Sequence, residues 1–220
     1  MSDGPWPRSS TRTIFWDVDT QVDFIHADGL LAVPGAVDVV PVLARLTDFA
    51  HASGIRIVAT ADDHDLGHAE ITTAEQADWR ATFPPHCMRG TPGQRKITET
   101  ALHDRLLLEP VYPDADVPSV IGEHRGDFLL HKPGLDVFEW NPHAAAVLTV
   151  LAPERVVIYG VATDFCVSAA VAGLRRRLPG VDLVVVQDGI AAIDAAAGIA
   201  LCNRWRQDGI RMADAATLTG

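Results

Sequence analysis

Short apolar segments alternate with amphipathic ones along most of this sequence, and this alternation limits the possible folds more than any other feature. Runs of β-branched and aromatic residues have the length of buried strands, and they cover residues 13–18, 55–61, 129–131, 155–159, 183–187 and 209–212. Apolar residues at helical spacing lie between them, over residues 37–51, 141–151, 164–178 and 193–207. Nearly all-apolar strands separated by helices are typical of a parallel sheet covered on both faces. We therefore expect an α/β fold, a three-layer α/β/α sandwich around a mostly parallel six-stranded sheet.

The length of 220 residues fits one large domain better than two small ones. Residues 1–12 are polar and contain two prolines, so we interpret them as an N-terminal arm and 13–220 as a single domain. The stretch 62–126 interrupts the strand–helix alternation and is polar and rich in His, Pro and Gly. An irregular stretch of that length inside a compact domain is usually functional.

The charge balance excludes some classes of partner. Lys and Arg number 18 against 29 Asp and Glu, a net charge of −11, whereas nucleic acids and anionic membranes select basic surfaces. No apolar run is long enough to cross a bilayer, and the N-terminal residues lack the apolar segment of a signal peptide. The three cysteines, an odd number, do not form a disulfide framework. We expect a cytoplasmic protein that binds neither nucleic acid nor membrane.

Ionisable side chains follow four of the predicted strands. Asp19 comes after the first strand, Asp62 and His64 after the second, Lys132 after the third and Cys166 after the fourth. Ligands bind at the carboxyl ends of the strands in open parallel sheets, so these side chains are predicted to meet at one edge. This convergence predicts an active site.

Cys166 is the strongest candidate for a nucleophile. It lies in the predicted first turn of a helix, with Thr163 or Asp164 as the cap, where backbone N–H groups and the helix dipole stabilise a thiolate. An ammonium on Lys132 would have the same effect, and Asp19 could accept the thiol proton. A lone cysteine is more often a small core residue, but the position after a strand and beside two ionisable groups favours the catalytic interpretation.

The other two cysteines have weaker support as nucleophiles. Cys202 lies among apolar residues of the last predicted helix, which indicates packing. Cys87 directly follows His86, but neighbours in sequence seldom point at one another, so we interpret Cys87 as a loop residue near the site.

A pattern of Asp and His residues predicts a metal site. Asp62 and His64 are two residues apart, so they face the same side of an extended chain, and His68 and His86 can approach from the loop. One carboxylate with three imidazoles suits Zn²⁺, Fe²⁺ or Mn²⁺. Asp63 and Asp65 flank this pattern and could serve as ligands instead.

The sequence resembles the isochorismatase-like cysteine hydrolases, and within them the nicotinamidases. The resemblance covers nearly the whole chain after the N-terminal arm. Its specificity comes from the order and spacing of six segments: VDTQVDF (18–24), LAVPGA (31–36), TADDHDLGH (60–68), FPPHCMRGTPG (83–93), HKPGLDVF (131–138) and GVATDFCV (160–167).

The resemblance implies a role for each catalytic position. Asp19 would be the general base and acid, Lys132 would stabilise the thiolate, and Cys166 would be the nucleophile. Val161–Ala162 would be a cis peptide that turns the N–H of Ala162 toward the N–H of Cys166, and these two groups would form an oxyanion hole. The isochorismatase branch lacks the cysteine and cleaves a vinyl ether.

The resemblance also implies a cofactor, a substrate and an assembly. Asp62, His64, His68 and His86 would hold one divalent metal ion, which in nicotinamidases binds the pyridine nitrogen. The spacing from His64 to His68 is shorter than the family pattern. The substrate would be a small amide, nicotinamide or a close heteroaryl carboxamide, contacted by Phe24, Phe83 and Val161; Phe83 stands where these enzymes commonly carry Trp. A homo-oligomer, a dimer or tetramer, is usual in the family.

Three different functions also fit these residues. The chain could be another amidase of the superfamily that acts on a carbamoyl, ureido or maleamic-type amide. It could be a binding protein that keeps the fold without catalysis. It could also be a metal hydrolase in which metal-bound water attacks the substrate, and Cys166 would then be dispensable.

Overall fold

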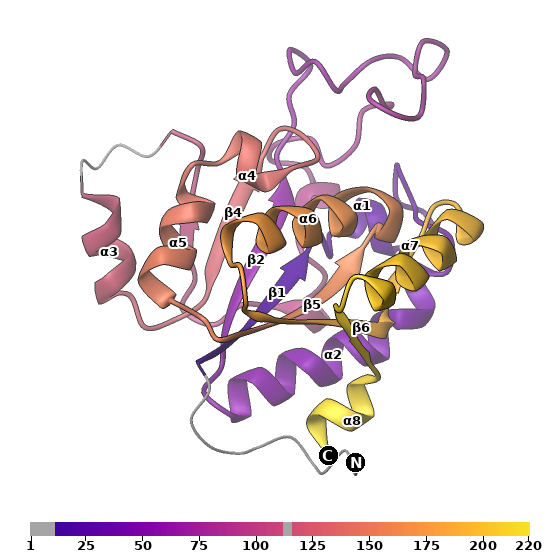
Figure 1. Ribbon diagram of the computed structural model, residues 1–220. Coiled ribbons are helices and arrows are strands. Elements are labelled where there is room, and N and C mark those ends of the chain that lie inside the picture. The colour runs from indigo at the N-terminus through magenta and orange to yellow at the C-terminus, as the bar shows by residue number, and fades with distance from the viewer. Residues whose placement is uncertain (1–11, 112–115) are drawn as a thin grey trace.

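A seven-stranded, wholly parallel sheet forms the centre of the computed structural model, which describes residues 12–111 and 116–220 (Figure 1). Its order is β3-β4-β2-β1-β5-β6-β7. The strands are β1 (Thr13–Val18), β2 (Arg56–Asp62), β3 (Leu106–Leu108), β4 (Phe128–Lys132), β5 (Arg155–Val161), β6 (Asp182–Ala191) and β7 (Arg211–Ala213). All six predicted strands are present. The predicted number was wrong by one, because β3 lies within the stretch predicted to be irregular.

Helices cover both faces of the sheet, which confirms the predicted three-layer α/β/α sandwich. One face carries α1 (Val22–Ile25), α2 (Ala36–Ala52) and α8 (Ala215–Thr219). The other carries α3 (Val117–Glu123), α4 (Val137–Trp140), α5 (His143–Leu151), α6 (Ser168–Arg177) and α7 (Ala195–Gln207). The predicted arm lies outside the described residues except for Arg12, which pairs with Glu154.

Successive side chains of the central strand β1 point to opposite faces of the sheet and fill the hydrophobic core on each face. In β1, Ile14 and Trp16 face the layer of α4 and α5, whereas Phe15 faces α2. Trp16 stacks on Phe138 of α4 with ring centroids 5.5 Å apart, and Phe15 meets Tyr159 of β5 edge-on at 6.0 Å. Because both faces of β1 are buried, its register against β2 and β5 is strongly specified.

The stretch between β2 and β4 has two parts. Residues beyond β2 form a loop that projects above the edge where the strands end (Figure 1). The later part is more regular than predicted, with two short 3₁₀ turns (Pro92–Gln94 and Thr98–Thr100), β3 and α3. The loop ends are joined by backbone hydrogen bonds from His64 N to Cys87 O (3.2 Å) and from Arg89 N to His64 O (2.8 Å).

Two predicted helices begin later than expected. Helix α5 begins at His143 because the Asn141 side chain donates to the carbonyls of Leu108 and His131 at 2.8 and 2.9 Å, which ties that residue to the sheet. Helix α7 begins at Ala195, where the Asp194 carboxylate accepts the N–H groups of the first turn.

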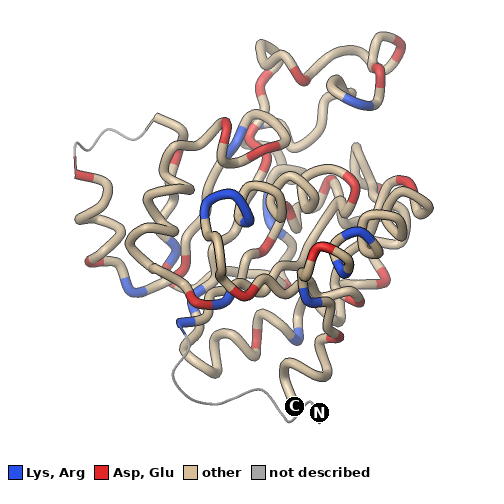
Figure 2. The backbone as a smooth tube through the Cα atoms, in the orientation of Figure 1, with Lys and Arg blue, Asp and Glu red and all other residues tan. Residues whose placement is uncertain are grey.

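Charged residues are distributed over the whole backbone, with one basic run at the end of α6 (Figure 2). These three arginines have partners: Arg175 pairs with Asp208, Arg176 pairs with Asp136, and Arg177 lies over the ring of Phe138. Among the helices of the described residues, none has both the length and the apolar character that a membrane-spanning helix needs.

Candidate active site

Three neighbouring strands bring two carboxylates and a lysine to one buried point. Asp19 follows β1, Asp62 ends β2 and Lys132 ends β4. The Lys132 Nζ lies 2.9 Å from Asp19 Oδ2 and also contacts Asp62 Oδ1. All three side chains are at most 2% exposed. The parallel register of β2 with β4 sets Asp62 directly opposite Lys132, so the contact follows from strand pairing.

Cys166 approaches this cluster from β5. The π-helical turn η3 (Thr163–Val167) directly follows β5 and precedes α6, and it carries the thiol inward. The Cys166 Sγ lies 3.5 Å from Lys132 Nζ, and one carboxylate oxygen each of Asp19 and Asp62 lies within 4.8 Å of it. Turns of this π type are frequent at functional sites. The structure therefore brings Asp19, Lys132 and Cys166 together.

Asp164, predicted as a possible helix cap, has a different role. Its carboxylate accepts the N–H groups of Ile193 (2.9 Å) and Asp194 (2.8 Å), so it joins η3 to the segment before α7. No side chain caps the start of η3.

Burial decides the resting protonation of the thiol. Burial raises the pKa of Cys166 well above its usual value, and the Lys132 ammonium offsets only part of this effect. Burial also raises the pKa of Asp19, again against the influence of Lys132. Burial alone would lower the pKa of Lys132, but the carboxylates of Asp19 and Asp62 raise it well above normal. These directions favour a neutral thiol beside an ammonium, in place of the stabilised thiolate predicted from the helix start.

Backbone and polar side chains fix the two acids. The Thr60 hydroxyl donates to Asp19 Oδ1 at 2.6 Å, and Asp19 itself has a positive φ of 48°. Gln21 holds the Asp62 backbone from both directions, because its Nε2 donates to Asp62 O (2.8 Å) and its Oε1 accepts Asp62 N (2.7 Å). Gln21 and Thr60 are positioning residues that sequence reasoning did not identify.

A second cluster of possible metal ligands shares Asp62. Ligand atoms of Asp62, His64, Glu70 and His86 lie within 4.8 Å of one another. His86 Nδ1 donates to the carbonyl of Pro84 at 2.8 Å, which leaves Nε2 to face Asp62 Oδ2 at 3.6 Å. Both ring nitrogens of His64 are buried without a hydrogen-bond partner among the described residues, and the Nε2 atom lies 3.5 Å from Asp62 Oδ2. An orphaned buried imidazole beside two carboxyl groups fits a divalent cation.

Glu70 occupies the position in this cluster that was predicted for His68. The His68 ring pairs with Asp65 instead: Nε2 lies 3.3 Å from Asp65 Oδ2, and Nδ1 accepts Asp65 N–H. Two residues further along, the carbonyl of Glu70 accepts the N–H of Phe83 at 2.8 Å, which fixes Glu70 at the base of the projecting loop. Burial, and next the charge of Asp62, raise the pKa of Glu70 to about 7.

The two acids that flank the metal pattern and the two remaining cysteines lie outside both clusters. Asp63 pairs with Arg89 and accepts from Gln94, and Asp65 is exposed. Cys87 is fully buried in the core on the α2 side. Cys202 is half-buried and packs beside the other core, as predicted for that residue.

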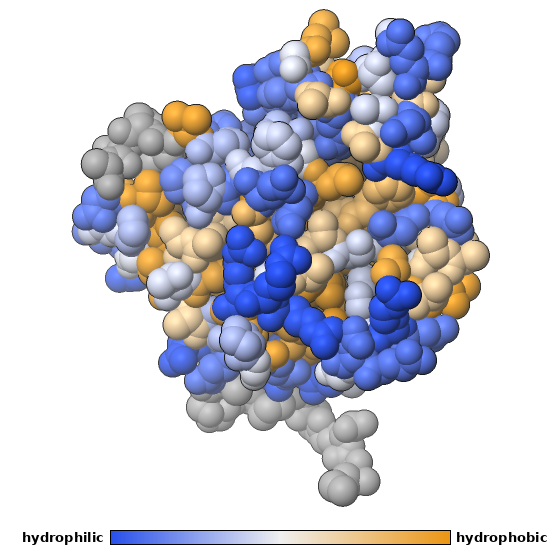
Figure 3. Space-filling view, turned by 45° about the horizontal axis from the view of Figure 1, so that its top comes forward, coloured by the Kyte–Doolittle hydropathy of each residue, from blue (hydrophilic) through white to orange (hydrophobic). Residues whose placement is uncertain are grey.

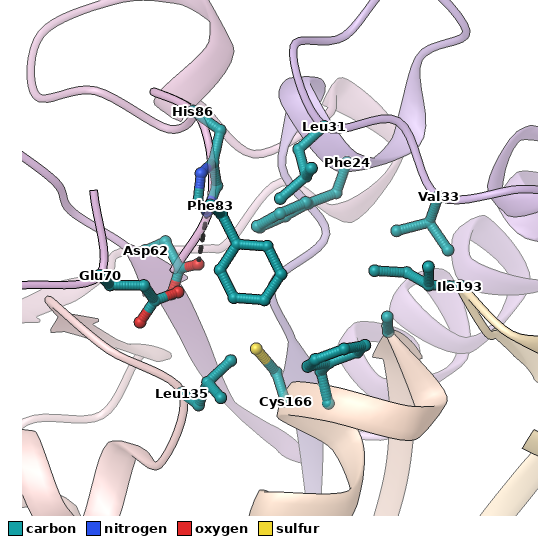
Figure 4. Close-up of a pocket in the computed structure, with 12 residues that line it drawn as sticks. Phe24, Leu31, Val33, Asp62, Glu70, Phe83, His86, Leu135, Cys166 and Ile193 are labelled. Atoms are coloured by element: carbon teal, nitrogen blue, oxygen red, sulfur yellow. Dashed lines mark ion pairs between the residues drawn. The ribbon is translucent and has the colours of Figure 1, made fainter. Parts of the chain in front are cut away.

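A pocket opens onto the Cys166 sulfur (Figure 4). Its lining comprises Phe24, Leu31, Val33, Asp62, Glu70, Phe83, His86, Leu135, Ala162, Phe165, Cys166 and Ile193. Phe24 and Phe83, both predicted as substrate contacts, are among these residues, with Phe83 edge-on to Phe165 at a centroid distance of 5.6 Å. Viewed with the top of the molecule forward, hydrophobic residues gather between the projecting loop and the body (Figure 3).

Val161, also predicted as a substrate contact, is not among the residues that line this pocket, so its contact stays a prediction. It ends β5 and is fully buried in the core on the α2 side. The peptide bond from Val161 to Ala162 is cis, and Ala162 does line the pocket.

Comparison with known sequences identifies the family. The family model of the isochorismatase domain matches residues 14–217. The chain belongs to the isochorismatase family. The match begins within β1 and ends within α8.

The proteins that are similar to this isochorismatase-family chain bear the names of different amidases. A nicotinamidase/pyrazinamidase from Mycobacterium tuberculosis is 25% identical over 201 residues, which are 89% of this chain and 95% of the relative. The pyrazinamidase of Pyrococcus horikoshii in complex with zinc has a TM-score of 0.70 at 22% identity, covering 92% of this chain and 99% of that one. The N-carbamoylsarcosine amidase from Thermoplasma acidophilum has a TM-score of 0.68 at 24% identity, covering 94% and 99%. The two structures show a shared fold, and the fold alone does not select the amide.

Proposed function

We propose that this isochorismatase-family chain hydrolyses nicotinamide, or a close heteroaryl carboxamide, to the acid and ammonia through a thioester on Cys166. Membership of the family, with a nicotinamidase/pyrazinamidase among the relatives, makes the chain a hydrolase of amide carbon–nitrogen bonds. One observation carries the proposed mechanism: Lys132 Nζ lies 2.9 Å from Asp19 and 3.5 Å from the Cys166 sulfur, at the base of an aromatic-walled pocket.

Acylation begins with a neutral thiol. Asp19 takes the proton from Cys166 Sγ as the sulfur attacks the carboxamide carbon. The N–H groups of Ala162 and Cys166 would stabilise the oxyanion, and Lys132 offsets negative charge next to the sulfur. The carbon–nitrogen bond then breaks, and the amine leaves as ammonia with the proton that Asp19 returns.

Deacylation uses the same acid. Water attacks the thioester carbonyl while Asp19 accepts one of its protons, and the bond to sulfur breaks. Asp19 then returns this proton to Cys166, so one water is consumed and the carboxylic acid is released. The low exposure of Asp19 and Lys132 keeps bulk water away from both proton transfers.

Asp62, His64, Glu70 and His86 would hold one divalent ion, Zn²⁺, Fe²⁺ or Mn²⁺, and the orphaned nitrogens of His64 support this set. When bound there, the ion supplies a Lewis acid that attracts a ring nitrogen and so orients a heteroaryl amide between Phe24 and Phe83.

The charge of the pocket favours an uncharged aromatic amide over maleamic-type acids. Its lining, within the described residues, includes no lysine or arginine, whereas Asp62 and Glu70 both carry carboxyl groups. Within this lining, a substrate carboxylate would therefore meet two carboxyl groups and no cationic side chain. Uncharged carbamoyl and ureido amides are the second candidate class, and a protein that is isolated without metal and prefers them would favour it.

Ammonia release from nicotinamide tests the mechanism. We expect activity in the wild type and a loss of at least about a thousandfold in Cys166→Ala, because the thioester cannot form. Cys202→Ala is the matched control, since Cys202 lies on α7 and does not line this pocket, and it should retain activity. An unchanged rate in Cys166→Ala would exclude the thioester and favour a metal-hydrolase route.

We further propose that the chain functions as a cytoplasmic homo-oligomer. The cysteines of the described residues are all free, which fits a reducing compartment. Size-exclusion chromatography with light scattering measures the assembly directly.

A further inference from the structure

The pocket has two chemically unlike sides, and the Cys166 sulfur lies between them (Figure 4). One side carries the polar groups Asp62, Glu70 and His86. The opposite side is aliphatic and is formed by Leu31, Val33 and Ile193. Nicotinamide itself has polar atoms only at its carboxamide and ring nitrogen, so neither of these groups accounts for the aliphatic side.

The first part of the aliphatic side is held against α1. The N–H of Val33 donates to the carbonyl of Phe24 at 2.9 Å, and the N–H of Leu31 donates to the carbonyl of Asp23 at 3.1 Å. Phe24 is an aromatic wall of the same pocket. The aliphatic residues are therefore fixed relative to the surface on which a substrate ring would lie.

The second part is held against the nucleophile turn. The Asp164 carboxylate accepts the N–H of Ile193 at 2.9 Å, and Asp164 lies two residues before Cys166 in η3. Ile193 is 37% exposed and Leu31 is half-buried. A rigid aliphatic wall that is still partly open to solvent gains free energy when a ligand covers it.

We propose that this wall is a subsite for a small hydrocarbon substituent on the substrate ring, so the preferred substrates are nicotinamides with an alkyl group at the 5-position. The proposal rests on the proposed function. With the carboxamide carbon at Cys166 Sγ and the ring nitrogen toward Asp62, Glu70 and His86, the 5-position is the one ring carbon that is meta to both. It points away from both groups, toward the aliphatic side.

The test compares kcat/KM for nicotinamide, 5-methylnicotinamide, 5-ethylnicotinamide and 6-methylnicotinamide, measured by ammonia release with the metal-loaded enzyme. Each buried methyl or methylene group should raise kcat/KM about fourfold. The 6-methyl compound is the matched probe, because its methyl group adjoins the ring nitrogen on the polar side and should lower kcat/KM.

A variant pair locates the effect. Ile193→Asp should lower the ratio of kcat/KM for 5-ethylnicotinamide over nicotinamide by at least about tenfold, since a charge replaces the aliphatic wall. Ile199→Asp makes the same change at an isoleucine of α7 that is 65% exposed and outside this pocket, and it should leave the ratio unchanged. Calorimetric titration of Cys166→Ala with both amides gives the corresponding ratio of Kd without turnover.

The outcomes separate the two proposals. If nicotinamide is hydrolysed but the 5-alkyl compounds have no higher kcat/KM, the subsite proposal is overturned and the proposed function stands. The same conclusion follows if Ile193→Asp does not change the ratio of kcat/KM for 5-ethylnicotinamide over nicotinamide. If neither nicotinamide nor its 5-alkyl derivatives release ammonia, the proposed function fails and the subsite falls with it.

Discussion

Glu70 brings a carboxyl group into a site that already holds Asp62 and Asp19. Burial and the neighbouring Asp62 raise its pKa to about 7, against an ordinary value of 4.5. A proton neutralises this group in metal-free protein at acidic pH, whereas a divalent ion would stabilise its ionised form. Glu70 therefore has opposite effects on stability with and without metal.

We predict that Glu70→Gln removes a pH dependence from the metal-free protein. Because the folded carboxyl has the higher pKa, wild-type protein binds more protons folded than unfolded between pH 4.5 and about 7. Its stability thus falls as pH rises through this window. The variant has no such proton, so at pH 8 in a chelator it should be more stable than wild type by roughly 1–3 kcal/mol. Urea unfolding at pH 5 and pH 8 measures this.

The same variant should bind Zn²⁺ more weakly in competition with a chelator, because one ligand oxygen loses its charge. Glu154→Gln is the control, since Glu154 pairs with Arg12 and belongs to none of the groups of possible metal ligands among the described residues, and it should keep the affinity of wild type. A metal-free Glu70→Gln protein with the full pH dependence of wild type would contradict our assignment of that dependence to Glu70.

Residue type and strand position were sufficient to predict where Asp19, Lys132 and Cys166 meet, because each follows a strand whose register is set by burial. The fourth metal-type residue was not predictable in this way. His68 has the better ligand chemistry, but its ring pairs with Asp65, and the loop backbone directs Glu70 inward through its bond to Phe83. Those loop contacts leave no periodic signal in the sequence.

Near the junction of β5 with η3, the structure leaves no space for a side chain at Gly160. Gly160 has a φ of 117°, and a Cβ atom there would lie 2.0 Å from the carbonyl oxygen of Val18 in β1. A side chain would push apart the two central strands that carry Asp19 and Cys166. The requirement for glycine is thus steric as well as conformational.

We predict that Gly160→Ala destabilises the protein by at least about 3 kcal/mol or prevents soluble expression. Gly180→Ala is the control: Gly180 also has a positive φ, of 85°, but nothing lies within 4 Å of its added Cβ, so only the backbone cost of about 1–2 kcal/mol applies. Urea denaturation compares the two free energies of unfolding. Equal losses would show that the contact with Val18 has no effect.

Strand and helix prediction succeeded where an element has its own hydrophobic pattern. It missed β3 because Leu106–Leu108 is only three residues long and lies among polar residues. The π-helical turn was predicted as an ordinary helix start, since its residues continue the pattern of α6 and the widened turn has no distinct sequence pattern.

Over the whole molecule, the catalytic residues and the possible metal ligands are carried by different structural elements. Asp19, Lys132 and Cys166 extend from the sheet or the turn that follows it, whereas three of the four metal-type residues lie on the loop after β2. The two ends of the loop are joined by backbone hydrogen bonds of His64 with Cys87 and Arg89. Glu70 lies further out, in the part of the loop between these two ends. Metal binding would therefore stabilise the loop more than the sheet.

We predict that Zn²⁺ slows amide hydrogen exchange in residues 64–88 relative to chelated protein and leaves α5 unchanged. The ion would link the loop ligands to Asp62 at the end of β2, and this link would reduce local opening of the loop without altering the packing of the rest of the protein. Hydrogen-exchange mass spectrometry of the full chain with and without a chelator measures it. Equal protection of α5 and the loop would instead indicate a global effect of the ion.

The order of the strands along the chain also determines which of these side chains a nascent chain contains as it leaves the ribosome. Strands β1 and β2 emerge first with both acids, β4 adds the lysine, and β5 brings the thiol last, on the opposite side of β1. A translation product released after β4 therefore carries the acids and the lysine but lacks Cys166, the proposed nucleophile. The protein becomes chemically competent only late in its own synthesis.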